Sequence, residues 1–218
     1  MLLIYTQINI GEMKVISEYI KVKNEKYLPN KAECFEPKEI ERFLKDGTVL
    51  CQKKLALLIG LFGALRCSEL YNLEFQDIVR EENRLVITVR SSKTDKKRAG
   101  FSYIVPNNSD PVLSVFTYFD EYIKMVPSNL RNGPFFLTIQ LPGPKRIYAL
   151  VTKILRGINL FGRLPREIAQ LLQKTNPKQY TGHSIRRTTA TWLAANGANE
   201  IQLKMEEHIC GNGLCCSI

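Results

Sequence analysis

The chain has 218 residues, enough for one large domain with an ordinary hydrophobic core. Lysine and arginine exceed aspartate and glutamate by ten, which favours a polyanionic partner, either nucleic acid or an anionic membrane surface. No stretch is apolar and long enough to span a bilayer, and the apolar start Met1–Ile10 lacks the basic region of a signal peptide. We therefore expect a globular chain without a membrane partner.

The six cysteines do not form the framework of a small disulfide-rich protein, because the chain is long and three of them lie far apart. Cys34, Cys51 and Cys67 are widely spaced, and two of these are in or beside apolar runs. Such thiols are typical of a reducing compartment. We therefore expect a nuclear or cytoplasmic location.

The first predicted elements are helices. Glu36-Pro37-Lys38-Glu39 begins one, since proline suits a first turn and acidic residues suit the positive end of the helix dipole. A second, strongly apolar helix is predicted over Val49–Leu65, loosened at Gly63 and buried on most sides. Ser68 is placed to cap a short third helix that starts at Glu69.

The spacing of the hydrophobic residues then changes from the helical pattern to the alternation typical of β-strands. Alternating β-branched residues predict strands over Leu85–Val89 and Phe101–Val105, joined by the polar turn Ser91–Gly100, with Asp77–Val79 as a third strand. Four later helices and one short extended piece complete the prediction: Pro111–Met125, Pro134–Leu137 (extended), Ala149–Ile158, Pro165–Leu172 and Ser184–Asn196, the last bracketed by Gly182 and Gly197. The predicted class is mainly α with a small antiparallel β-sheet (α+β).

Three cationic segments stand out along this chain. In the first, Ala64-Leu65-Arg66-Cys67-Ser68-Glu69-Leu70, an arginine directly follows the apolar helix. The carboxylate of Glu69 can hold the Arg66 guanidinium, which still presents a fork to phosphate oxygens. A structural Arg66–Glu69 pair on a surface turn is the alternative, and this segment by itself favours it.

The second segment lies on the predicted hairpin and the third begins the last helix. A lysine projected by a turn, here Lys93, can protonate an alkoxide leaving group, although a solvated basic loop is the commoner case. His183 and Arg186 stand three residues apart at a helix N-terminus, so both can face one anion. A capping histidine with two surface arginines is the alternative, and here the pattern favours the anion site.

Together the segments follow the order arginine at a helix turn, lysine on a hairpin, then His-x-x-Arg at the start of a late helix. Over about residues 31–204 the chain thereby resembles the catalytic domain of the tyrosine recombinase (phage integrase) family, whose members break and rejoin DNA. Three stretches resemble its eukaryotic, mobile-element-derived (Crypton-like) branch: Phe135-Phe136-Leu137, Asn159-Leu160-Phe161-Gly162-Arg163-Leu164-Pro165 and Tyr180-Thr181-Gly182-His183-Ser184-Ile185-Arg186-Arg187.

The resemblance implies a role for each cationic residue. Arg66 and Arg186 would clamp the non-bridging oxygens of the scissile phosphate, with Glu69 bracing Arg66. Lys93 would protonate the leaving 5′ oxygen, and His183 would serve in acid–base transfer. A tyrosine would form a covalent 3′-phosphotyrosine link, without metal, cofactor or small-molecule substrate. The implied partner is DNA, contacted through its phosphate backbone, with a homo-oligomer assembled on it for recombination and integration.

The sequence departs from the family pattern at both ends. All nine tyrosines precede His183, and the family positions of a second histidine or tryptophan and of the nucleophile fall at Ile209 and about Ile218. We interpret residues 205–218 as an aberrant tail and residues 1–30 as the remnant of a DNA-clamping region or a linker. A metal site in the tail is disfavoured by its spacing; its candidate ligands are His208, Cys210, Cys215 and Cys216.

We therefore predict a recombinase-like domain that binds DNA phosphates and is inactive because the nucleophilic tyrosine is missing. One alternative keeps catalysis, with a tyrosine supplied by another subunit. Another is a domesticated DNA-binding or protein-interaction module without catalysis. A related strand-rotating topoisomerase ranks below these, because residues 181–187 are more like those of recombinases.

Overall fold

The computed structural model describes residues 18–19, 22, 31–90, 100–137 and 159–198. The chain divides into two compact units, Met1–Lys31 and Ala32–Ile218, and all elements named below belong to the second. The hairpin turn with Lys93, the predicted helix Ala149–Ile158 and the tail from 199 onward lie outside the described residues. Across the part of the chain that is described, no helix has the length and apolar character needed to cross a membrane.

The sheet has three antiparallel strands in the order β1-β2-β3, namely β1 (Ile78–Arg80), β2 (Arg84–Val89) and β3 (Phe101–Pro106). On β2 the buried side chains are Leu85, Ile87 and Val89, and on β3 Tyr103 and Val105 face the same core. This alternation, with one sheet face buried, confirms the strands predicted at 85–89 and 101–105. The antiparallel pairing of β1 with β2 confirms the third.

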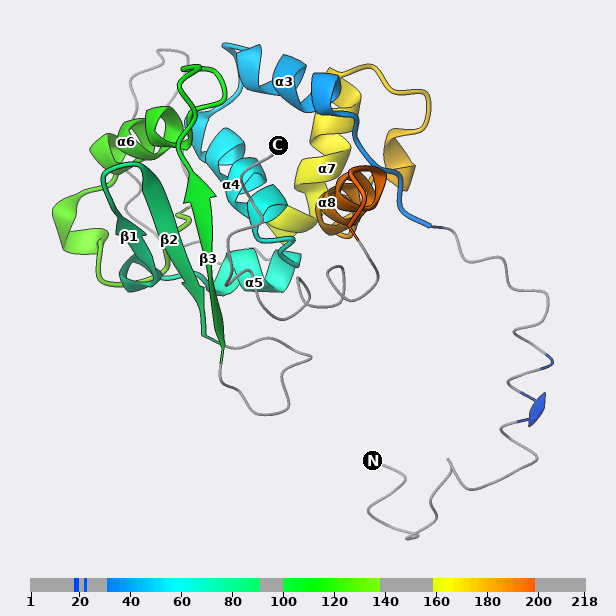
Figure 1. Ribbon diagram of the computed structural model, residues 1–218, viewed down its shortest axis with the longest axis horizontal. Coiled ribbons are helices and arrows are strands. Elements are labelled where there is room, and N and C mark those ends of the chain that lie inside the picture. Colours follow the sequence, from blue (N-terminus) through cyan, green and yellow to red (C-terminus); the bar gives the residue numbers. More distant parts are fainter. Residues whose placement is uncertain (1–17, 20–21, 23–30, 91–99, 138–158, 199–218) are drawn as a thin grey trace, which may run out of the picture. The chain divides into compact units, whose positions relative to one another are not determined.

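Six α-helices accompany the sheet in the described part of residues 32–218: α3 (Pro37–Lys45), α4 (Cys51–Phe62), α5 (Cys67–Asn72), α6 (Val115–Met125), α7 (Asn159–Leu171) and α8 (Ser184–Ala195). Three short 3-10 helices lie between them, η2 (Phe75–Asp77), η3 (Ser128–Leu130) and η4 (Pro177–Gln179). Helix α4 is central, with the sheet and α6 on one side and α7 and α8 on the other (Figure 1). Ten of its twelve residues are buried, as its near-continuous apolar sequence predicts. The class is therefore mainly helical with a small antiparallel sheet, as predicted.

The predicted starts of the helices at Glu69 and Pro111 were wrong, and in both cases a cap explains the difference. Helix α5 begins at Cys67, because the Glu69 carboxylate accepts a hydrogen bond from the Arg66 backbone N–H at 2.8 Å, so Ser68 is inside the helix and does not cap it. The helix predicted from Pro111 begins at Val115, because the Ser114 hydroxyl accepts a hydrogen bond from the Thr117 N–H at 3.2 Å.

Helix α7 begins six residues before the predicted start and passes through Pro165. Proline lacks the N–H that would bond the carbonyl four residues earlier, so a helix interior is normally a poor place for it. Here Phe161, Leu164 and Ile168 are buried on one face. Burial of this face offsets the missing hydrogen bond and keeps the helix continuous.

The sheet docks tightly against the end of α4 at Gly63. The Tyr103 hydroxyl donates to the Ile59 carbonyl at 3.0 Å, and a Cβ on Gly63 would come within 2.5 Å of the Tyr103 ring. Only glycine allows this approach. The contact fixes the turn that follows α4, and this turn leads directly into Arg66.

Candidate functional site

Arg66 lies at the N-terminus of α5 and is held by a buried carboxylate. Its Nη1 donates to Glu69 Oε1 at 2.8 Å, while the other oxygen of Glu69 caps the Arg66 backbone N–H. The Glu69 side chain is 3% exposed and that of Arg66 is 23% exposed. The structure therefore contains the Arg66–Glu69 pair, and the guanidinium still reaches solvent.

The turn before Arg66 is tight and carries a left-handed residue. Ala64 has φ of +44°, which costs strain for a residue with a Cβ, and the Leu65 N–H donates to the Gly60 carbonyl at 2.9 Å. In this geometry the Ala64 carbonyl accepts a hydrogen bond from Arg186 Nη1 at 3.2 Å. The guanidinium of Arg186 is thus bound to the backbone two residues before Arg66.

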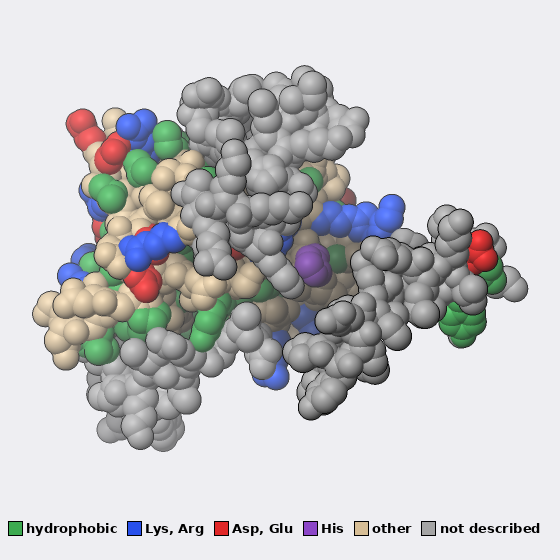
Figure 2. All heavy atoms as spheres, turned by 90° about the horizontal axis from the view of Figure 1, so that it is seen from below, with side chains coloured by type: hydrophobic (Ala, Val, Ile, Leu, Met, Phe, Trp, Pro, Cys, Tyr) green, Lys and Arg blue, Asp and Glu red, His purple; other side chains and the backbone are tan. Residues whose placement is uncertain are grey.

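The second segment of the site is the turn that begins α8. The Thr181 N–H donates to the buried Ser184 hydroxyl at 3.0 Å, and the His183 N–H donates to the Thr181 hydroxyl at 3.3 Å. His183 is the N-cap residue of α8, and its side chain is exposed. Figure 2 shows one face of the molecule on which a histidine side chain lies open, with lysine and arginine side chains on the same face.

Helix α8 is fixed on α4 by close packing. The Thr189 hydroxyl donates to the Leu61 carbonyl at 2.7 Å. A Cβ on Gly60 would lie 3.1 Å from the Ile185 side chain, so the glycine lets the two helices approach closely. This packing sets the position of Arg186, which lies one residue after Ile185.

The two segments, residues 64–69 and 181–187, also meet at Cys67. Its thiol donates to the Gly182 carbonyl at 3.2 Å. Burial raises the pKa of Cys67, so the thiol keeps its proton at neutral pH. The structure therefore brings together Arg66, His183 and Arg186 in two adjoining segments, whereas Lys93 lies outside the described residues.

An anchor for α8 that the sequence did not predict is the extended segment at 32–35. The Phe35 N–H donates to the Thr188 hydroxyl, and its carbonyl accepts from Trp192 Nε1, both at 2.9 Å. Arg187 Nη1 donates to the Ala32 carbonyl. More than 150 residues separate the partners, so no local pattern could have indicated these bonds. They explain why Arg187, unlike Arg186, is directed away from the Ala64 carbonyl.

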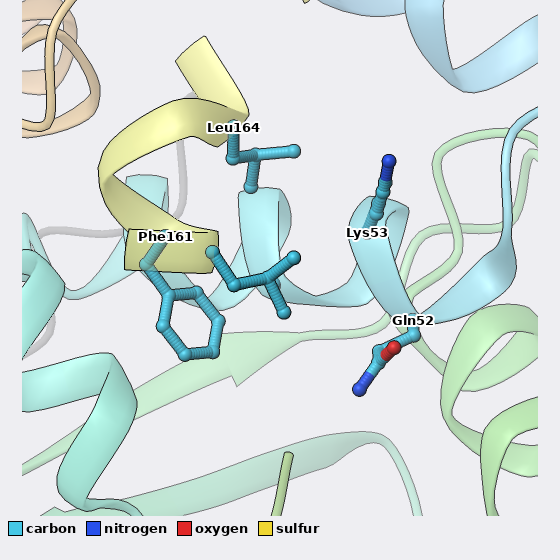
Figure 3. A pocket seen from close by; sticks show the side chains of 6 residues that line it. Gln52, Lys53, Phe161 and Leu164 are labelled. Atoms are coloured by element: carbon cyan, nitrogen blue, oxygen red, sulfur yellow. The ribbon is translucent and has the colours of Figure 1, made fainter. Parts of the chain in front are cut away.

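A small pocket lies between α4 and α7, and Figure 3 shows Phe161 and Leu164 on one side of it and Gln52 and Lys53 on the other. Its volume of about 10 Å³ is near the lower limit for one water molecule. The Lys53 ammonium is paired with Glu167 at 2.6 Å. The pocket does not include the three site residues. Among the described residues no group of three or more histidines, cysteines and acids could hold a metal, and the four tail residues considered as ligands lie outside them.

No family model matches the sequence, and no curated protein matches it. Solved recombinases match its structure. XerA recombinase gives a TM-score of 0.54 at 18% identity, covering 98% of this chain and 72% of XerA. XerH site-specific recombinase, in a pre-cleavage complex with its difH substrate, gives 0.54 at 16% identity, covering 82% of this chain and 47% of XerH. The Tn1549 transposon integrase in complex with circular intermediate DNA gives 0.50 at 22% identity, covering 89% and 71%.

These structures share the mainly helical architecture with a small sheet, and they are tyrosine recombinases. The chain spans less than half the length of XerH and about seven tenths of XerA. The chain therefore has the fold of tyrosine recombinase catalytic domains.

Proposed function

We propose that this chain binds duplex DNA by placing a backbone phosphate between Arg66 and Arg186. The observation that carries the proposal is the joining of their two segments, through the Arg186–Ala64 and Cys67–Gly182 hydrogen bonds. Two planar guanidinium groups from adjoining segments suit the non-bridging oxygens of a phosphodiester. The N-terminus of α8 adds backbone N–H groups and a positive dipole end next to His183. The XerH and Tn1549 integrase structures, whose fold this chain shares, are complexes with DNA.

The exposed face of α7 extends this surface. Arg163 and Arg166 are exposed and stand three residues apart on α7, so both point to the same side of the helix. Gly162 lies beside Gly182, since a Cβ on Gly182 would come within 3.4 Å of the Gly162 Cα. We propose that the two arginines contact phosphates next to the one held by Arg66 and Arg186.

We further propose that the chain by itself binds DNA without cleaving it. Strand cleavage in the resembled family needs a tyrosine nucleophile, and three tyrosines have buried hydroxyls that donate to backbone carbonyls: Tyr103, Tyr118 and Tyr122. Burial raises the pKa of Tyr118 to about 12 and also raises that of Tyr122, so neither forms a phenolate readily. A DNA duplex with a nick beside the phosphate that a tyrosine would attack should trap no covalent adduct with this chain. An adduct would contradict this part of the proposal, and one formed only with an intact recombinase partner would support a tyrosine supplied in trans.

The roles of Lys93 in leaving-group protonation and of His183 in acid–base transfer belong to the same proposal. So do assembly as a homo-oligomer on DNA, descent from the mobile-element-derived branch and a part in recombination and integration. They rest on the resemblance of the sequence to the family, and the branch rests on the stretches 135–137, 159–165 and 180–187. Exposure of His183 is consistent with contact between its imidazole and a bound DNA strand.

The proposal is tested by measuring duplex affinity as a function of salt. Replacing Arg66 by alanine would remove the guanidinium that faces the buried Glu69 carboxylate, so the informative variant is Arg66→Ala combined with Glu69→Gln, which keeps an acceptor for the backbone N–H of residue 66 without the charge. A matched control removes the exposed Arg84–Glu81 pair at the β1–β2 turn in the same way, as Arg84→Ala with Glu81→Gln.

Removal of a charge-assisted hydrogen bond to phosphate should weaken binding by about tenfold or more. The slope of log K against log salt should fall by roughly 0.9 for each phosphate that is no longer neutralised. The control pair should leave affinity and slope nearly unchanged. Equal affinity of the wild type and the Arg66/Glu69 variant, or binding that does not respond to salt, would overturn the proposed function.

A further inference from the structure

Three small residues from three elements meet at the centre of the site: Cys67 at the first position of α5, Gly162 in α7 and Gly182 in the turn before α8. A Cβ on Gly182 would lie 2.6 Å from Cys67 Sγ, 3.4 Å from Gly162 Cα and 3.8 Å from Cys67 Cβ. The thiol therefore fills the space that any side chain at position 182 would need. Nothing in the proposed chemistry uses this thiol directly.

Cys67 and Gly182 are each adjacent in the sequence to a site residue. Cys67 directly follows Arg66, and Gly182 directly precedes His183. The hydrogen bond of 3.2 Å therefore joins the Cys67 side chain in one cationic segment to the Gly182 backbone in the other. The second bond between them, from Arg186 to Ala64, involves a side chain that we assign to phosphate binding. Cys67 can hold the segments together without making a phosphate contact itself.

We propose that Cys67 is a positioning residue, which sets the separation between Arg66 and the His183–Arg186 turn through its hydrogen bond to the Gly182 carbonyl. This inference rests on the proposed function and extends it to a residue that the motif pattern does not include. Because burial keeps the thiol protonated, it serves as a donor throughout the neutral range. A hydroxyl can replace this donor, whereas a methyl group cannot.

The test compares Cys67→Ala with Cys67→Ser in the full chain, using duplex affinity, its salt slope and thermal unfolding. We expect Cys67→Ala to bind DNA about fivefold more weakly, the equivalent of one hydrogen bond, with a smaller salt slope, while remaining folded at the assay temperature. Cys67→Ser should recover most of the affinity. The matched control is Cys51→Ala, since Cys51 is another free thiol at the first position of a helix, α4, and its charged neighbours, Lys54 and Glu121, lie in α4 and α6.

A second pair of variants tests the geometry directly. Gly182→Ala should weaken binding more than tenfold, because its Cβ collides with Sγ, and the backbone of Gly182 does not have a positive φ that would penalise alanine for another reason. Adding Cys67→Ala removes the colliding atom, so the double variant should bind more tightly than Gly182→Ala alone.

The outcomes separate the two claims. Unchanged affinity and slope in Cys67→Ala, or a double variant no better than Gly182→Ala, would overturn the positioning role while leaving DNA binding intact. A decrease in affinity that Cys51→Ala reproduces, or that Cys67→Ser does not relieve, would assign the effect to stability and also overturn it. Absence of salt-dependent binding by the wild type would overturn the proposed function, and the positioning role with it.

Discussion

Gly63→Ala should destabilise the fold strongly, although it adds a single methyl group. The new Cβ would lie 2.5 Å from Tyr103 Cζ and 2.8 Å from both adjacent ring carbons, distances that atoms do not adopt. The ring cannot move aside easily, because Tyr103 is 1% exposed and its hydroxyl is bonded to the Ile59 carbonyl. The sheet must therefore shift away from the end of α4.

The cost can be worked from these distances and this hydrogen bond. Overpacking a rigid core site costs about 1–3 kcal/mol, and breaking the Tyr103–Ile59 hydrogen bond adds about 1 kcal/mol. For a domain of this size the sum corresponds to a decrease in Tm on the order of 10 °C. The turn that bears Ala64 follows Gly63 directly, so DNA affinity should fall as well.

The assay is thermal unfolding followed by circular dichroism, with Gly63→Ala alone and combined with Tyr103→Leu. Since leucine removes the ring atoms that collide with the new Cβ, the double variant should lose less stability than the sum of the two single losses. A Tm of Gly63→Ala within a degree or two of the wild type would refute the close approach of the sheet to α4. Strict additivity in the double variant would refute the ring as its cause.

Three further predictions concern the surroundings of the site. Gly162→Ala should stabilise the chain by about 0.5–1 kcal/mol, because alanine is the better helix former and its Cβ meets nothing within 4 Å; destabilisation in urea unfolding would show that the space is filled. Trp192→Phe should cost about 1 kcal/mol because the bond to the Phe35 carbonyl is removed, measured by the same unfolding, and no cost would show that the 32–35 segment is not held there. Loss of the Glu39–Lys174 ion pair, whose N–O distance is 2.6 Å, should lower the free energy of unfolding at both low and high pH. A variant with Glu39→Gln and Lys174→Met should lose less stability at each extreme, and a pH profile identical to that of the wild type would count against the pair.

The direction of each pH effect follows from the direction in which the pKa of Glu39 and the pKa of Lys174 are shifted. Burial alone would raise the pKa of Glu39, but the Glu36 N–H and the Lys174 ammonium outweigh it and lower the pKa below 4.5. The contribution of Glu39 is therefore complete above its unfolded pKa and is lost as pH falls through the folded pKa. The hydrogen bond to Glu39 raises the pKa of Lys174 above 10.5, so its contribution is complete below that value and is lost as pH rises through the folded pKa.

Local patterns predicted the elements well where burial is one-sided. The alternation on β2 and β3 has one buried face, and both strands lie where this alternation predicts them. Helix α3 begins where its proline and acidic residues indicated. The predicted start of α7 was wrong, because proline is typical of a first turn, whereas here the apolar face from Phe161 to Ile168 continues through Pro165.

The site could be predicted only in part, because its assembly depends on contacts between distant segments. The Arg66–Glu69 pair was visible as a spacing of three residues, and the structure shows that bond. The bonds from Arg186 to Ala64 and from Cys67 to Gly182 join residues more than 110 positions apart. Glycine at 60, 63 and 182 marks positions of close approach, and such glycines are the one sequence signal that could have pointed to these contacts.

The most direct test of the central claim is whether Arg66 and Arg186 hold the same phosphate. A double-mutant cycle on duplex affinity answers this, with Arg66→Ala/Glu69→Gln, Arg186→Ala and their combination, each measured over a range of salt concentrations. If one phosphate is held only while both side chains are present, the combined loss of affinity should be clearly smaller than the sum of the separate losses, and the salt slope should fall by roughly 0.9 in all three variants. Additive losses, with the slope falling twice as far in the combined variant, would place the two arginines on separate phosphates and contradict the shared phosphate site.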